Sequence, residues 1–230
     1  EGVSMALALQ DFSTNSLKLW NTFLNASQGY EGHVYVGLGW AIAEAKPGNL
    51  SFINTIPPLM QYRLWDGCGY YNGLFNQRLT IRNQVRPEYI NEINFKAYDE
   101  GIGRSFWYSF KGDVLRVKDM IQRFSPSRHA DLWRGIGIAS AYVGGCDEPV
   151  LKQLFLSADN HSIQLCIGAA MVAKARVNAQ SITQDVDLAC AVWCKLTTQE
   201  VMLLIDKTES SADSFESFLL QTEMEINKVD

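Results

Sequence analysis

Small-residue segments recur along the chain at a nearly constant interval, and this repeat restricts the fold more than any other feature. Six such segments align on Ser4, Gly39, Gly69, Gly103, Gly137 and Gly168. The successive intervals are 35, 30, 34, 34 and 31 residues, a period typical of repeats that contain two helices each. We therefore expect an all-α chain of about six helix hairpins, as a tetratricopeptide-like α-solenoid or as a closed α/α toroid.

The recurring glycines are expected to lie inside helices, where glycine is unfavourable. Each one lowers helix stability by about 1 kcal/mol relative to alanine. Ten such glycines would together offset much of the stability of a domain. The pattern is therefore expected only if neighbouring helices approach so closely at these positions that a Cβ atom would clash.

Helix boundary signals fit this picture. A helix is expected from Pro126, with Ser125 as its cap, to the glycines that begin at Gly144. Another is expected to begin at Pro87 and to end before Gly112. Further helix caps are expected at Asp113, Asp147 and Thr197.

The charge of the chain is unevenly distributed. The 230 residues carry a net charge of −5, which argues against nucleic acid as a partner. Residues 206–230 hold seven acidic residues and two lysines, so this segment accounts for the whole net charge. We expect a helical-repeat domain over residues 1–205, with sequence missing upstream of Glu1, and an acidic capping or docking helix over 206–230.

The five cysteines are expected to be free. Their number is odd and they lie among apolar or small residues, which favours buried thiols in a reducing, cytoplasmic compartment. No spacing of Cys and His suggests a metal site, and no cofactor is expected. The longest uncharged runs are about a dozen residues, shorter than the ~20 that a spanning helix needs.

Signatures of common enzymes are missing from the sequence. It lacks the nucleophile-elbow, zinc-protease and P-loop motifs. The Gly-x-Gly pairs recur without the strand and third glycine of a dinucleotide fingerprint. Acidic residues that could protonate an apolar substrate are weak candidates for catalysis, and for Asp99 and Glu100 a solvated helix end is the simpler explanation. They are Asp66, Asp99 and Glu100.

Aromatic and arginine side chains follow the repeated glycines. They could line a groove that anchors a partner protein or an apolar small molecule. They could equally be core residues between repeats, with arginine side chains reaching the surface. The candidate binding residues are Trp40, Tyr70, Tyr71, Arg104, Trp107, Tyr108, Arg134 and Tyr142.

Several blocks together resemble a known bacterial family. The blocks are Val34–Ala43, Asp66–Phe75, Ala97–Trp107, Arg128–Gly145, Ile167–Arg176 and Asp187–Cys194. Their order resembles the "domain of unknown function 1702" family, which is found in gene clusters for enediyne and related polyketide biosynthesis. The resemblance implies an accessory role in natural-product assembly and supplies no catalytic residues.

Two functions follow from these features. The first is a helical-repeat binding or scaffold protein, which the repeats and the missing catalytic motifs favour. The second is a small biosynthetic enzyme, such as a cyclase that acts on a polyene or isoprenoid in an aromatic-lined cavity, because aromatic rings can stabilise carbocations. The enzyme requires a closed cavity that contains a carboxylic acid.

Overall fold

The computed structural model describes residues 1–228, and these residues form helices without any β-strand. The expected all-α class is confirmed. The chain forms two compact units, Glu1–Ile102 and Gly103–Asp230, and the division falls within the helix α5 (Phe95–Ser109). The expected boundary at residue 205 stays a prediction; it lies inside the helix α11 (Thr198–Ser211).

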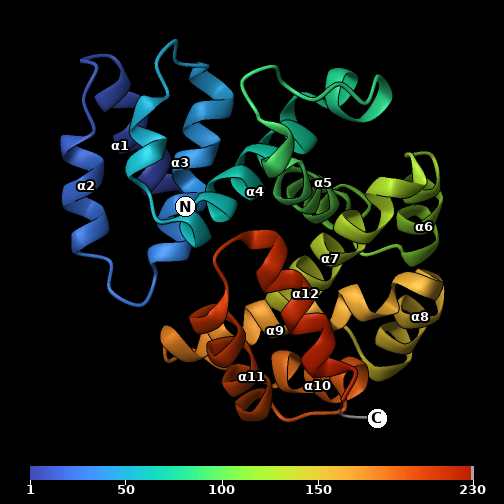
Figure 1. Ribbon diagram of the computed structural model, residues 1–230. Helices are drawn as coiled ribbons and strands as arrows, with labels where there is room; N and C mark the ends of the chain where they lie inside the picture. The colour runs from blue at the N-terminus through green and yellow to red at the C-terminus, as the bar shows by residue number, and fades with distance from the viewer. Residues whose placement is uncertain (229–230) are drawn as a thin grey trace. The chain divides into compact units, whose positions relative to one another are not determined.

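The first unit is built around three long helices, of which α3 packs against both α1 and α4 (Figure 1). Its elements are α1 (Gly2–Phe12), α2 (Lys18–Asn25), α3 (Glu31–Ala45), the 3₁₀ helix η1 (Ser51–Thr55), α4 (Pro58–Phe75), the π-helical turn η2 (Arg78–Arg82), the 3₁₀ turn η3 (Glu92–Asn94) and the first part of α5 (Phe95–Ser109).

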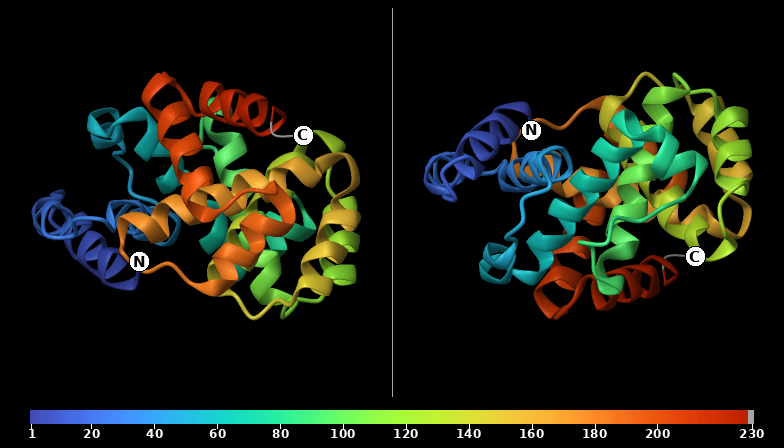
Figure 2. Two further views of the ribbon diagram at one scale, coloured as in Figure 1. Left: turned by 90° about the horizontal axis from the view of Figure 1, so that it is seen from below. Right: turned by 90° about the horizontal axis from the view of Figure 1, so that it is seen from above.

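The second unit is built around α9, which packs against α7, α10 and α11. Figure 2 shows α11 and α12 alongside α9. The elements are the rest of α5, α6 (Val114–Gln122), α7 (Pro126–Val143), α8 (Glu148–Ala158), the 3₁₀ turn η4 (Asp159–His161), α9 (Ser162–Asn178), α10 (Gln184–Cys194), α11 (Thr198–Ser211) and α12 (Phe215–Ile226).

Glycines hold the long helices of the first unit in close contact, as the sequence predicts. A Cβ atom on Gly39 of α3 would overlap the Leu64 carbonyl oxygen of α4. In return, a Cβ atom on Gly67 of α4 would overlap the Val36 carbonyl oxygen of α3. Backbone therefore packs on backbone, which offsets the low helix propensity of glycine.

The second unit repeats this reciprocal contact between α7 and α9. Gly137 of α7 faces the backbone of Leu165, and Gly168 of α9 faces the backbone of Arg134. Gly103 of α5 faces the backbone of Leu132 in the same way. In both units the glycines thus act as contact points between helices.

Most of the expected helix boundaries are observed. Helix α7 ends at Val143 and is followed by Gly144, whose positive φ of 73° suits glycine. Asp113 caps α6 by accepting from two backbone N–H groups. Thr197 forms the capping box of α11 with Glu200. The expected helix start at Pro87 is wrong, because α5 begins at Phe95 after an irregular segment that contains η2 and η3.

The expectation that all five cysteines are free is wrong. Cys166 of α9 and Cys194 of α10 form a disulfide bond, so two of the five cysteines are not free. Cys68 and Cys190 are buried thiols and Cys146 is a half-buried one. The expectation of a cytoplasmic location depended on free cysteines, and the two cysteines in the disulfide bond do not support it.

The acidic C-terminal segment is partly neutralised by lysines. Lys174 of α9 forms ion pairs with Asp206 and Glu209 of α11. On its apolar side, α12 buries Phe218 and Leu219. Within residues 1–228, no single helix is long and apolar enough to cross a membrane; α10 and α11 reach that length only as a pair bent by 72°.

Candidate ligand-binding site

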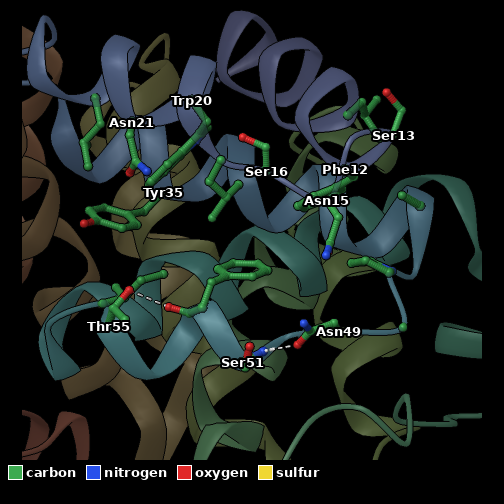
Figure 3. Close-up of a pocket in the computed structure, with 18 residues that line it drawn as sticks. Phe12, Ser13, Asn15, Ser16, Trp20, Asn21, Tyr35, Asn49, Ser51 and Thr55 are labelled. Atoms are coloured by element: carbon green, nitrogen blue, oxygen red, sulfur yellow. Dashed lines mark hydrogen bonds between the residues drawn. The ribbon is translucent and has the colours of Figure 1, made fainter.

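A cavity of about 690 Å³ lies in the first unit, between the C-terminal half of α1, α2, α3 and the segment 45–56 (Figure 3). This volume lies within the ~300–1,000 Å³ range of small-molecule sites. Figure 3 places Tyr35 and Asn21 on one side of the cavity, and Ser13 and Asn15 on the other. The cavity lies wholly within the first unit.

Hydrogen bonds from buried side chains fix the wall formed by α1 and α2. The Ser4 hydroxyl donates to the Val34 carbonyl oxygen (2.6 Å) and accepts from the Trp20 indole N–H (2.8 Å). The buried Asp11 carboxylate accepts from the backbone N–H of Trp20 (2.9 Å). These bonds connect α1, α2 and α3, so the Trp20 ring is held in a fixed position at the cavity.

Two aromatic pairs form the apolar part of the lining. The rings of Trp20 and Tyr35 meet edge to face with centroids 5.4 Å apart, and those of Phe12 and Phe52 lie 6.1 Å apart at a tilt. Both geometries are favourable for aromatic pairs. The pairs come from α1, α2, α3 and η1, so rings from four elements face one cavity.

The wall opposite α2 is the segment that follows α3. Helix α3 ends at Ala45, and the next residue, Lys46, adopts the left-handed conformation (φ 47°) and turns the chain toward η1. The Asn49 side-chain oxygen accepts from the Ser51 N–H (2.9 Å), and the Thr55 hydroxyl donates to the Phe52 carbonyl oxygen (2.7 Å). Dashed lines in Figure 3 mark these two bonds. They order the short turns that carry the polar lining.

No charged side chain lines the cavity. Its lining contains no Asp, Glu, Lys, Arg, His or Cys. The only titratable group there is the Tyr35 phenol, and burial, with a smaller contribution from Glu31, raises its pKa above the ordinary value. The lining is therefore neutral at physiological pH, and it holds no carboxylic acid or imidazole.

The three candidate acids lie elsewhere in the first unit. Asp66, Asp99 and Glu100 are fully buried, and none of them lines the cavity. Asp99 forms an ion pair with Arg86. Residues 1–228 bring no three His, Cys, Asp or Glu side chains together in a way that could hold a metal ion.

The candidate binding residues of the first unit also lie outside this cavity. Trp40 stacks at a tilt on Tyr70, with ring centroids 5.5 Å apart, and the Tyr71 hydroxyl donates to Glu44. Tyr70 and Tyr71 are buried and Trp40 is half-buried. These side chains pack within the unit, and a binding role for them stays a prediction.

In the second unit the candidate residues divide into buried and surface groups. Arg104 and Arg134 are buried, and Arg134 donates to Asp131 (2.8 Å). The half-buried Tyr142 lies under the guanidinium of Arg176. Trp107, itself buried, and the more exposed Tyr108 line a smaller cavity of about 370 Å³ that also includes Lys111 and Cys146.

A model of the family described as "Protein of unknown function (DUF1702)" matches residues 1–220. The chain belongs to this family. No curated protein and no solved structure matches the chain. Membership of DUF1702 confirms the resemblance found in the sequence, and the description of the family assigns no function.

The sequence did not point to the cavity of this DUF1702 member. Its polar lining consists of serines, asparagines and a threonine, which are also the ordinary residues of turns. The aromatic part combines rings from segments up to 40 residues apart, from Phe12 to Phe52. The only local signals are the turns around residues 13–16 and 47–51, and these alone do not indicate a site.

Proposed function

We propose that this protein is a helical-repeat binding protein that holds a small molecule in the cavity of its first unit without transforming it. The observation that carries the proposal is an aromatic cavity of about 690 Å³ without a charged side chain. The aromatic rings of such a lining can bind an apolar surface, whereas acid–base chemistry needs a group that titrates near the working pH.

The repeat is the second part of the proposal. The same reciprocal glycine contact recurs between α3 and α4 and between α7 and α9. A recurring contact of this kind supports a stack of helix pairs, which gives a binding protein a rigid frame. We also propose an accessory role in natural-product assembly, because the sequence resembles DUF1702, a family found in gene clusters for polyketide biosynthesis.

An uncharged fluorescent probe, N-phenyl-1-naphthylamine, tests the binding function. We expect saturable binding with one probe per chain and a strong increase in fluorescence. Ser51→Trp, which fills the cavity, should abolish binding, whereas Gln28→Trp in the exposed turn that follows α2, outside the cavity, should leave it intact. Absence of saturable binding, or equal binding by both variants, would contradict the proposal.

The alternative is the biosynthetic enzyme. The buried Asp66, Asp99 and Glu100 are the feature that favours it, because buried carboxyl groups are common at catalytic sites. They lie outside the aromatic cavity, so the cavity cannot supply the acid that a cyclase needs. Turnover of a polyene by the wild-type chain that is lost in Asp66→Asn would support the enzyme instead.

A further inference from the structure

The chain exposes an apolar surface between positive charges where α4 ends. Phe75, the last residue of α4, and Leu79 in the turn η2 are each more than half exposed. Arg78 and Arg82 of η2 are exposed as well. The four positions are separated by three or four residues, the spacing of neighbours on one side of a helical segment. We call these four residues the basic face.

The positive charge of the basic face is not neutralised within the chain. Neither Arg78 nor Arg82 forms an ion pair within residues 1–228. The stretch from Gly67 to Pro87 contains three arginines and no acidic residue, although the whole chain carries a net charge of −5. Exposed apolar side chains beside unpaired charges of one sign are typical of an interaction surface.

Helix α12 exposes a face of the same form and the opposite charge. Leu220 and Met224 are each more than half exposed. Glu216, one turn before Leu220, is exposed, and Glu223, beside Met224 in sequence, is half-exposed. These positions also follow the three- and four-residue spacing of one side of a helix. We call these four residues the acidic face.

The complementarity of the two faces favours a second copy of the chain as the partner. Each face sets two apolar side chains beside two charges, so contact between them joins apolar to apolar groups and arginine to glutamate. An anionic membrane would attract the basic face alone and would repel the acidic face and the net charge of −5. A second copy accounts for both faces without a further component.

We infer that the basic face of one copy docks on the acidic face of another, with Phe75 and Leu79 packed on Leu220 and Met224. Stable interfaces bury ~1,200–2,000 Å², more than two short helical segments offer. The association is therefore weak and reversible, with a dissociation constant in the micromolar range. Neither face contains a residue that lines the ligand cavity, so this inference stands or falls independently of the proposed function.

Sedimentation equilibrium of the whole chain tests the self-association. In 50 mM NaCl we expect the average mass to rise from one copy toward two or more over a concentration series up to ~500 μM. In 500 mM NaCl the dissociation constant should be at least tenfold higher, because salt screens exposed charges. A single copy throughout the series, or an association that salt does not weaken, overturns the inference.

Two variants with an introduced charge test the faces separately. Leu79→Glu places an acid in the basic face and Leu220→Arg places a base in the acidic face, so each should stay a single copy where the wild-type chain associates. Leu115→Glu on α6 and Leu156→Arg on α8 are the matched controls, because both leucines are more than half exposed and lie outside both faces. Association by Leu79→Glu or Leu220→Arg, or its loss in the controls, overturns the assignment.

An equimolar mixture of Leu79→Glu and Leu220→Arg tests the pairing itself. The first variant keeps an intact acidic face and the second an intact basic face. We expect the mixture to associate although neither variant does so alone, a result that misfolded chains would not give. No association in the mixture overturns the pairing. Cosedimentation of a single-copy wild-type chain with phosphatidylglycerol vesicles, lost in Leu79→Glu, would assign the basic face to a membrane and overturn the inference as well.

Discussion

Gly67 of α4 packs so closely on Val36 of α3 that a Cβ atom at residue 67 would overlap the Val36 carbonyl oxygen. The neighbour is backbone and not the end of a flexible side chain, so the two helices would have to separate. The contact is reciprocal, since Gly39 of α3 meets Leu64 of α4 in the same way. Helix separation at one residue therefore disturbs the whole α3–α4 interface.

We predict that Gly67→Ala lowers the free energy of unfolding by about 2 kcal/mol or more, because overpacking outweighs the gain in helix propensity. Gly2→Ala is the control, since Gly2 is also helical and has no atom within 4 Å of the added Cβ position. Urea unfolding monitored by circular dichroism measures both. Equal stability of the two variants would contradict the close-packing role of Gly67.

The contact between Tyr71 and Glu44 predicts a pH dependence at high pH. Burial and the hydrogen bond to the Glu44 carboxylate raise the pKa of Tyr71 to about 12, above its value of about 10 in an unfolded chain. The stabilisation is therefore fully present below pH 10 and is lost as the pH rises toward 12.

Tyr71→Phe should make the fall in melting temperature between pH 10 and pH 12 shallower than in the wild-type chain. Glu44→Gln, which removes the carboxylate charge, should have a similar effect. Thermal unfolding at a series of pH values measures the slopes, and identical slopes in all three proteins would rule out this origin of the pH dependence.

The cysteines can be distinguished by their reactivity. Burial raises the pKa of the Cys190 thiol to about 12 and also raises the pKa of the Cys68 and Cys146 thiols. Cys68 and Cys190 are buried away from a reagent in solution, whereas Cys146 is only half-buried. Iodoacetamide at pH 8 should therefore label Cys146 alone in the native chain, three cysteines after denaturation, and five after denaturation with reduction. Mass spectrometry counts the labels. Five labels on the denatured, unreduced chain would contradict the disulfide between Cys166 and Cys194.

The fold could be predicted from the sequence where local chemistry decides the structure. Asp113 and Thr197 cap helices because their side-chain oxygens lie within reach of the first free N–H groups. Pro87 was misleading because proline is favoured in turns as well as at helix starts, and the chain from Asn76 to Asn94 uses it in an irregular connection.

The cavity could not be predicted because its properties arise from tertiary packing. Nothing local distinguishes Tyr35 from the other tyrosines; its place in the lining depends on the packing of its ring against Trp20. The Cys166–Cys194 bond also joins two helices 28 residues apart in sequence, and cysteine spacing alone does not determine such a pairing.

Arg134 is a candidate binding residue that is buried, and a last prediction tests whether it stabilises the fold. Its side chain is 1% exposed, and its guanidinium donates to Asp131 on the same helix and to Gln164 on α9 (3.1 Å). Gln164 in turn donates to Glu223 on α12 (3.4 Å).

We predict that Arg134→Ala lowers the free energy of unfolding by about 3–5 kcal/mol, because it leaves the Asp131 carboxylate without this partner in a largely buried position. Arg123→Ala on the exposed end of α6 is the matched control and should change stability by less than about 1 kcal/mol. Denaturant unfolding of the three proteins decides the matter: a loss below about 1 kcal/mol in Arg134→Ala would favour a binding role over a structural one.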